Sequence, residues 1–197
     1  MLGCLGVAAA LAGPPEGWTD LGAAGVRVEA RYATTANFTG APLPGYDVGA
    51  AWLRAPVAEA LLRVQAALAP THAALLVYDA YRPARASVAM VDWARRTGNL
   101  WVVDQGYVAP KSQHNKGTTV DLTLVDLPTG QPVDMGSAWD EFSPASHTDN
   151  ATGAALVQRH RLRDAMVAEG FVPYAKEWWH FGYKLDGAEP IDLPYTP

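Results

Sequence analysis

The chain has 197 residues, of which 49% are hydrophobic and 18% are charged, and its formal net charge is −5 at pH 7. This composition excludes a disordered chain, and one domain of this length buries about 70% of the surface that its unfolded chain exposes. No run of Lys or Arg occurs, whereas a nucleic-acid partner would require a basic stripe. The single cysteine, Cys4, excludes a disulfide within the chain.

The N-terminal segment, residues 1–20, contains an apolar stretch that ends in Ala-Leu-Ala at residue 12. The stretch resembles the core and cleavage site of an export signal, but no basic residue precedes it. Two interpretations stay open: the remnant of an export signal in a periplasmic protein, or an unstructured or packed terminus in a cytoplasmic one. No other stretch approaches the about 18 apolar residues of a membrane span. Residues 21–197 are expected to form one catalytic domain, and the sequence makes no prediction of its oligomeric state.

The first elements predicted in chain order are a strand and a helix. Apolar and polar residues alternate over residues 26–32, which is typical of a half-buried strand. Residues 37–47 are rich in Gly and Pro and are expected to form a loop. Apolar residues then recur at helical spacing over residues 57–68, with Pro56 at the start and Pro70 as the stop.

The rest of the chain mixes helices and strands without regular alternation. A short apolar run predicts a buried strand over residues 73–78, and a second helix is expected over residues 85–97, closed by Gly98. The remaining predictions are a strand over residues 120–125, a helix over residues 152–169, and strands over residues 171–172 and 178–183. This order favours an α+β domain over a doubly wound α/β domain.

Polar residues gather beside aromatic or strand-forming residues in three segments. The first follows a predicted buried strand, the second spans a Gly-containing loop and a strand start, and the third lies near the C-terminus. They are Tyr78-Asp79-Ala80-Tyr81-Arg82-Pro83, residues 112–121, and Lys176-Glu177-Trp178-Trp179-His180-Phe181.

A catalytic zinc needs three nitrogen or oxygen ligands and an open position for water. His114, Asp121 and His180 supply two imidazoles and one carboxylate, and the seven-residue gap between the first two lets the chain turn back on itself. Glu177 and His180 would face opposite sides of a straight strand, so a helical turn or kink is expected between them. Glu177 would then lie beside the metal as a base that takes a proton from water.

Each of these residues also has an ordinary structural explanation. A histidine before a glycine in a loop is usually a surface residue, and an aspartate at a strand start is more often a cap than a ligand. The pair Trp178-Trp179 is most simply core. Arg82 could be an ion-pair partner of Asp79 rather than a catalytic residue.

A resemblance to a known family favours the catalytic interpretation. Residues 112–121 read Ser-x-His-x-x-Gly-x-x-x-Asp and residues 177–180 read Glu-x-Trp-His, which together resemble the double signature of the zinc D-Ala-D-Ala peptidases. The likeness is strongest to the D-alanyl-D-alanine dipeptidases of vancomycin-resistance type, in peptidase family M15. It extends over about residues 32–183 and includes Arg31-Tyr32-Ala33-Thr34, Asn37-Phe38-Thr39-Gly40, Tyr81-Arg82-Pro83, Asp121-Leu122-Thr123-Leu124 and Met135-Gly136-Ser137-Ala138-Trp139-Asp140.

The resemblance implies an α+β fold of the Hedgehog/DD-peptidase-like zinc peptidase type, with a central antiparallel sheet flanked by helices. It assigns His114, Asp121 and His180 to one zinc ion per subunit. It assigns Glu177 to the general base.

The resemblance also implies roles for residues outside the metal motifs. Arg82 is matched to the stabilisation of the oxyanion. Tyr32 and Asp140 are matched to residues around the free ammonium group of the substrate, and Ser112 to a small residue of the binding pocket. Thr119 departs from the alanine that is usual in the family, and its bulk is expected to narrow the pocket.

The function predicted first is hydrolysis of the dipeptide D-Ala-D-Ala to two D-alanines by zinc-activated water, without a covalent intermediate. A buried Asp140 would be left unpaired by an N-acylated substrate, at a cost on the order of several kcal/mol. The enzymatic alternative is a D,D-carboxypeptidase or endopeptidase that trims peptidoglycan stem peptides. A third alternative is a non-catalytic zinc-binding module, against which Glu177 and Arg82 argue, since such a module needs neither a base nor an oxyanion donor.

Overall fold

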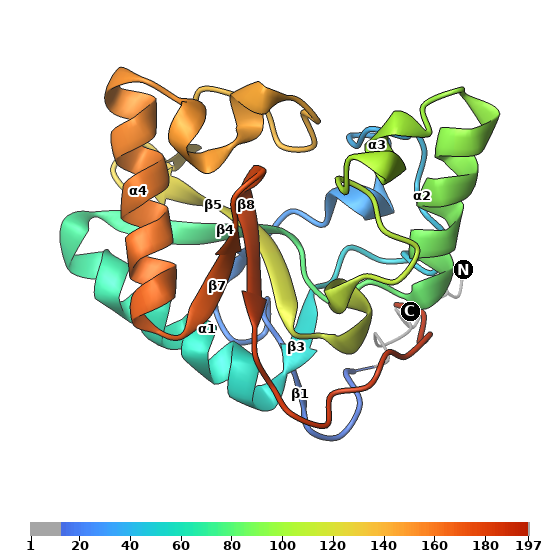
Figure 1. Ribbon diagram of the computed structural model, residues 1–197. Helices are drawn as coiled ribbons and strands as arrows, with labels where there is room; N and C mark the ends of the chain where they lie inside the picture. Colours follow the sequence, from blue (N-terminus) through green and yellow to red (C-terminus); the bar gives the residue numbers. More distant parts are fainter. Residues whose placement is uncertain (1–12, 197) are drawn as a thin grey trace, which may run out of the picture.

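A computed structural model describes residues 13–196, so Cys4 and the apolar stretch before residue 13 lie outside the described residues. A six-stranded sheet occupies the centre of the molecule (Figure 1). Its order is β2 (Arg27–Val28), β4 (Ala73–Asp79), β5 (Thr119–Asp126), β8 (Glu177–Tyr183) and β7 (Phe171–Tyr174), with β6 (Gln131–Pro132) also paired to β5. A second sheet pairs β1 (Trp18–Asp20) with β3 (Trp52–Arg54), so the ordered domain begins before residue 21.

Helices flank the sheet, as predicted for an α+β domain. The α-helices are α1 (Ala55–Leu68), α2 (Ala84–Arg96), α3 (Trp101–Asp104) and α4 (Gly153–Ala168). The 3-10 helices are η1 (Arg31–Ala33), η2 (Ala69–Thr71), η3 (Gln113–Lys116), η4 (Pro144–Ser146) and η5 (Thr148–Asn150). Within residues 13–196 no helix has the length and apolar character needed to cross a membrane.

The positions of the three longer helices confirm the sequence predictions. In α1 the apolar residues at helical spacing are all buried, and Pro56 lies in its first turn, where its missing N–H leaves no bond unmade. Helix α2 stops just before Gly98 and α4 just before Gly170, and these glycines adopt φ values of 74° and 90°. Glycine adopts this left-handed conformation without the steric cost that a side chain would add.

The strand predicted over residues 26–32 is wrong in its length. Only Arg27 and Val28 form β2, which pairs with β4 in parallel, and the other strand pairs of both sheets are antiparallel. Pairing ends at Val28, which lies opposite Val77 of β4, and the chain turns into η1 at Arg31. Tyr32, the last residue of the predicted strand, instead lies in η1 and is buried.

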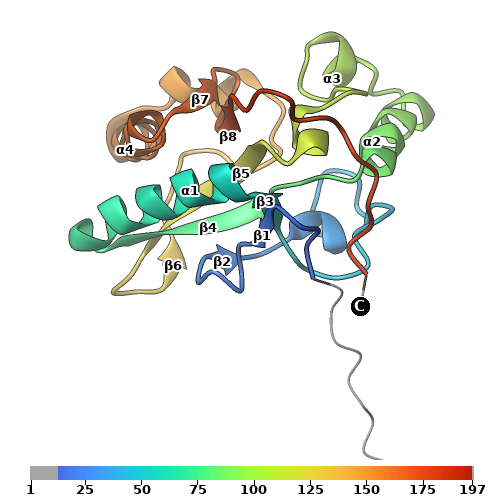
Figure 2. The same cartoon turned by 90° about the horizontal axis from the view of Figure 1, so that it is seen from below.

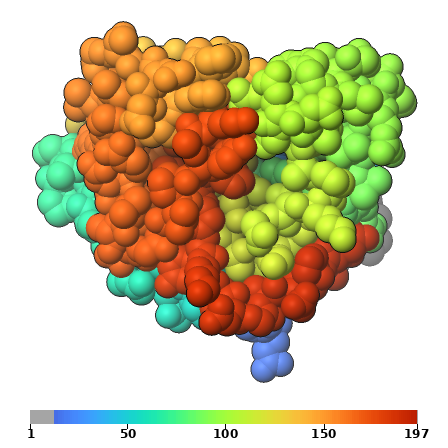
Figure 3. Space-filling model, in the orientation of Figure 1, coloured from blue at the N-terminus to red at the C-terminus, as the bar shows by residue number. Residues whose placement is uncertain are grey.

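The helices form two groups on either side of a cleft. Helices α1 and α4 contact each other and pack on the sheet, while α2 and α3 lie together across the cleft from α4 (Figures 1 and 2). The space-filling view shows the hollow between residues near 140–180 on one side and residues near 85–112 on the other (Figure 3). The strands β5 and β8 run beneath this opening, so their side chains can reach its floor.

Candidate active site

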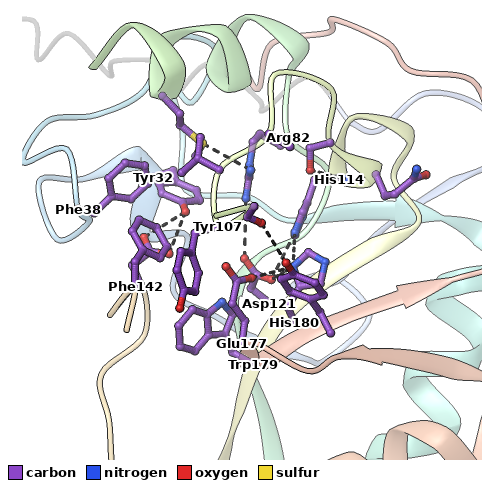
Figure 4. Close-up of a pocket in the computed structure, with 18 of the residues that line it drawn as sticks. Tyr32, Phe38, Arg82, Tyr107, His114, Asp121, Phe142, Glu177, Trp179 and His180 are labelled. Atoms are coloured by element: carbon purple, nitrogen blue, oxygen red, sulfur yellow. Dashed lines mark hydrogen bonds and ion pairs between the residues drawn. The ribbon is translucent and has the colours of Figure 1, made fainter. Parts of the chain in front are cut away.

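The cleft has a volume of about 260 Å³ and brings together all of the residues that the sequence motifs single out. It is lined by residues of η1, β5 and β8 and by the segments before η3 and after α3 (Figure 4). The eight predicted site residues that line it are Tyr32, Arg82, Ser112, His114, Asp121, Asp140, Glu177 and His180. The structure thus assembles residues separated by almost 150 positions into one site.

His114, Asp121 and His180 converge at the floor of the cleft. One ligand atom from each lies within 4.8 Å of the others. Nε2 of His114 lies 3.3 Å from Oδ1 of Asp121 and 3.3 Å from Nδ1 of His180, and that Nδ1 lies 3.0 Å from Oδ1 of Asp121. Two imidazole nitrogens and one carboxylate oxygen thus surround a common point, as a zinc site with an open position requires.

The loop that carries His114 is fixed by local hydrogen bonds. Ser112 caps η3: its hydroxyl accepts a hydrogen bond from the backbone N–H of His114, while the Asn115 side chain accepts one from the backbone of Ser112. Gly117 ends η3 at φ 67°, and a Cβ there would overlap the Trp18 ring. The glycine is therefore required both by backbone conformation and by the close approach of Trp18.

A kink is present at Glu177, as predicted, but it is an irregularity of the sheet rather than a helical turn, because Glu177 begins the strand β8. Pro173 pairs with Phe181, but the next residue of β7, Tyr174, pairs with Glu177, so three residues of β8 bulge out. The bulge turns Glu177 towards the cleft beside His180, whose Nδ1 lies 3.5 Å from its Oε2.

Two observations within the described residues fit a metal at this cluster. Oδ1 of Asp121 is buried and accepts no hydrogen bond, although it faces both imidazoles. Nδ1 of His114 donates to the carbonyl oxygen of Ala80 at 2.6 Å, which leaves Nε2 free of a proton and directed at the cluster. A cation between the three side chains would satisfy the carboxylate oxygen that is otherwise costly to bury.

Arg82 reaches the cleft while it pairs with a buried acid. Its Nε and Nη2 both donate to Oδ2 of Asp79, at 3.0 and 2.9 Å. Its Nη2 also lies 3.8 Å from Oδ2 of Asp121, and the side chain lines the cleft. The structural explanation of Arg82 and a role in the site are therefore compatible, since the ion pair holds the guanidinium beside the predicted metal ligands.

Tyr32 lies across the cleft from His180 (Figure 4), and its hydroxyl meets Asp140 there. The Tyr32 hydroxyl donates to the two carboxylate oxygens of Asp140 at 3.2 and 3.1 Å. Asp140 has a φ of 60°, a left-handed conformation that is unusual for a residue with a side chain. Ser112 lines the same cleft, and its hydroxyl also serves as the cap of η3.

The cleft is a strongly acidic environment. Burial raises the pKa of the Glu177 carboxyl well above its usual value, and the charges of Asp121 and Asp140 add to this. Burial also raises the pKa of Asp140, again with a contribution from Asp121. For Asp121 itself, burial opposes ionisation, but the neighbouring His114 and His180 outweigh it and hold the pKa below its usual range. Such an accumulation of carboxylates favours the binding of cations, whether metal or ammonium.

Comparison with known proteins identifies the family. The family model described as D-Ala-D-Ala dipeptidase matches residues 20–195. The chain is 41% identical over 186 residues to a D-alanyl-D-alanine dipeptidase of Enterococcus faecalis, covering 87% of this chain and 89% of the relative. It is 39% identical to one of Enterococcus faecium, covering 80% and 85%, and 38% identical to one of Streptomyces coelicolor, covering 81% and 87%. The chain belongs to the D-Ala-D-Ala dipeptidase family. It is therefore a peptidase, and His114, Asp121 and His180 form its candidate metal site.

The sequence motifs did not single out several aromatic residues near the cleft as site residues. Tyr107 stacks on Phe142 with ring centroids 5.4 Å apart, and its hydroxyl is 3.1 Å from Nε2 of His147. Phe38 packs edge-on against Phe142 at 4.9 Å, and Tyr174 also lines the cleft. These aromatic side chains come from loops and an edge strand, where no periodicity distinguishes them from core residues. The only sequence signal was for Phe38, which lies in one of the segments that resemble the family.

The expectation that Thr119 narrows the pocket of this dipeptidase-family chain is wrong. Thr119 does not line the cleft. Its side chain is fully buried within the sheet, where it pairs with Gly182 of β8.

Proposed function

We propose that this peptidase is a zinc-dependent D-Ala-D-Ala dipeptidase, which hydrolyses the free dipeptide to two D-alanines. The observation that carries the proposal is the convergence of His114, Asp121 and His180 with Glu177 on the floor of a small acidic cleft. The relatives support this substrate, since each of them is named D-alanyl-D-alanine dipeptidase. The central sheet, which carries Asp121 and His180, supports assignment to the Hedgehog/DD-peptidase-like fold.

His114, Asp121 and His180 would hold one zinc ion per chain. Zinc with two imidazoles and one carboxylate acts as a Lewis acid and lowers the pKa of a coordinated water. Glu177 is the proposed general base, because it lies beside His180 but outside the set of three ligand atoms. Its carboxylate would take the proton from the attacking water and return it to the nitrogen of the departing D-alanine.

Arg82 is the proposed donor to the oxyanion. Its guanidinium lies at the edge of the metal cluster, 3.8 Å from Oδ2 of Asp121, and the ion pair with Asp79 holds it there. A donor already fixed in position stabilises charge that develops on the carbonyl oxygen without a reorganisation cost.

Asp140, Tyr32 and Ser112 are the proposed substrate-binding residues. The carboxylate of Asp140, held by the hydroxyl of Tyr32, would pair with the free ammonium group of the dipeptide. An N-acylated substrate would bring a neutral amide to this buried acid and would leave it without a partner. The same contact thus disfavours the D,D-carboxypeptidase or endopeptidase alternative.

The experiment that tests this proposal compares two substrates on the zinc-loaded protein. Release of D-alanine is measured from free D-Ala-D-Ala and from N-acetyl-D-Ala-D-Ala. We expect kcat/KM to be at least about 1,000-fold higher for the free dipeptide, the scale of discrimination that an unpaired buried charge produces. Equal or greater activity on the acetylated substrate would establish the carboxypeptidase alternative, and no activity on either would contradict the enzyme function.

A further inference from the structure

Residues 135–147 form a loop that carries one wall of the cleft. Asp140 and Phe142 of this loop line the cleft, and Trp139 packs against the Tyr32 ring with centroids 5.0 Å apart. The loop begins with Met135 and ends at His147, next to η5 and helix α4 (Figure 1). The proposed function uses only Asp140 from this loop, so the other residues of the loop have no role in the chemistry described above.

A buried arginine on α4 joins the two ends of this loop. Arg159 is fully buried, and its Nε donates to the carbonyl oxygen of Met135 at 2.6 Å. Its Nη1 donates to the carbonyl oxygen of His147 at 2.7 Å, and its Nη2 donates to Oγ of Ser137 at 3.0 Å. One rigid, planar side chain therefore fixes the first residue, the last residue and one intermediate residue of the loop.

A directed chain of hydrogen bonds runs from Arg159 to the residue that follows Asp140. Oγ of Ser137 accepts from Arg159 and also from Nε1 of Trp178 at 3.0 Å, which occupies both of its lone pairs. The Ser137 hydroxyl must then donate its own hydrogen bond to Oγ of Ser146, 3.1 Å away. Ser146 in turn donates to the carbonyl oxygen of Glu141 at 2.5 Å.

These hydrogen bonds also link the two walls of the site. Trp178 directly follows Glu177 on β8, so Ser137 connects the strand of the proposed base to the loop of Asp140. Asp140 itself adopts the left-handed φ of 60°, a conformation that is unfavourable for a residue with a side chain. Such a conformation persists only where the surroundings hold it, and here Tyr32 bonds to the Asp140 carboxylate while Ser146 bonds to the carbonyl of the next residue, Glu141.

Fold stability alone does not account for Arg159. Its three hydrogen-bond acceptors are neutral, and within residues 13–196 it forms no ion pair. Burial lowers the pKa of its guanidinium, although the charges of Glu141 and Asp134 act in the opposite direction, and an arginine stays protonated in a protein. A buried charge whose hydrogen-bond partners are all neutral is costly, whereas an apolar side chain could fill the same space.

We propose that Arg159 and Ser137 are positioning residues that hold Asp140 where it meets the ammonium group of the substrate. They touch neither the substrate nor the metal ligands, and they act through the shape of the loop at residues 135–147. The inference rests on the proposed function, since it concerns the affinity and selectivity of that same site. Loss of these hydrogen bonds between Arg159 and Glu141 should therefore raise KM for the free dipeptide and leave kcat almost unchanged.

The test uses Ser137→Ala on the zinc-loaded protein, because Arg159→Ala would remove three buried hydrogen bonds at once and so combine a loss of stability with any loss of positioning. We expect KM for D-Ala-D-Ala to rise about tenfold, kcat to change less than about twofold, and zinc content to stay the same. Ser143→Ala is the matched control, since its hydroxyl lies in the same loop but bonds only to Glu141 Oε1 and the N–H of Ala145. It should keep KM within about twofold of the unchanged protein.

A double-mutant cycle separates positioning from a general loss of stability. In an Asp140→Asn background, Ser137→Ala should have little further effect on KM, because the residue through which it acts is already impaired. Ser137→Thr, which keeps the hydroxyl, should recover most of the affinity for the dipeptide. Equal effects of Ser137→Ala in both backgrounds, or an unchanged KM, would overturn the inference while leaving the proposed function intact.

A second measurement does not depend on turnover. Ser137→Ala should accelerate hydrogen–deuterium exchange of the amides in residues 138–147 about tenfold, whereas Ser143→Ala should affect only the amides near its own cap. Unchanged exchange after Ser137→Ala would contradict the positioning role even in a protein with no activity on D-Ala-D-Ala. An inactive wild-type protein with the predicted change in exchange would contradict the proposed function alone.

Discussion

Nη2 of Arg82 lies 2.9 Å from Oδ2 of Asp79, and this ion pair is almost completely buried beside the metal cluster. Asp79 also accepts a hydrogen bond from the Tyr46 hydroxyl at 2.6 Å and lies 3.3 Å from Nδ1 of His114. The Asp79 carboxylate thus contacts both the proposed oxyanion donor, Arg82, and a proposed metal ligand, His114. Substitutions in this pair are expected to affect catalysis and stability together.

Arg82→Ala should lower kcat by about 100- to 1,000-fold with a much smaller change in KM, since an oxyanion donor acts mainly in the transition state. It should also lower the free energy of unfolding by about 3–5 kcal/mol, because Asp79 is left buried without its cation. Arg82→Lys should recover only part of kcat, since an ammonium lacks the fork of a guanidinium. Steady-state kinetics and thermal melts on the same preparation measure both effects. A near-normal kcat in folded Arg82→Ala would reduce the residue to a structural role.

Removal of the metal should abolish hydrolysis of D-Ala-D-Ala, and added zinc should restore it. His114→Ala and His180→Ala should each lose bound zinc as well as activity, because each removes one of three ligands. Metal content by mass spectrometry or atomic absorption measures this directly. His160→Ala is the control, because this exposed histidine pairs with Asp149 far from the cluster in sequence and should keep both zinc and activity. A fully active preparation without metal would end the zinc hypothesis.

Glu177→Gln should keep zinc and the fold but lose turnover by about 100- to 10,000-fold, the contribution of a general base. The amide has nearly the shape of the carboxylate and cannot take up a proton at neutral pH. Zinc content, thermal stability and kcat are measured together. A metal-free variant would instead mean that Glu177 is a ligand, and the assignment of the base would be wrong.

Asp140→Asn should raise KM for free D-Ala-D-Ala by about 10- to 100-fold, because it removes the charge that is proposed to pair with the ammonium. It should also reduce the preference over N-acetyl-D-Ala-D-Ala, since a neutral side chain no longer penalises the acylated substrate. Tyr32→Phe should produce a smaller rise in KM, because it removes only the hydroxyl that holds the carboxylate. An unchanged ratio of kcat/KM for the two substrates would contradict the role of Asp140.

The local elements of this fold follow from the sequence alone. Apolar residues at helical spacing, a proline in the first turn and a glycine after the last are enough to locate α1, α2 and α4, because helix hydrogen bonds join residues four apart. The buried strands β4 and β5 are likewise local patterns of apolar residues. The candidate ligands and base could be named for a different reason, since residues 112–121 and 177–180 are short motifs that resemble a known family.

Tertiary structure alone decided how these pieces meet. Tyr32 and Asp140 lie 108 positions apart and still share a hydrogen bond, and no spacing in the sequence indicates their contact. The parallel pairing of β2 and the bulge that aims Glu177 depend on the neighbouring strands, so patterns within the strands themselves could predict neither this pairing nor the form of the kink at Glu177. The same is true of Arg159, whose partners lie on a loop more than ten residues away. Local periodicity reports which face of an element is buried, but the partner that covers that face is set by packing of the whole chain.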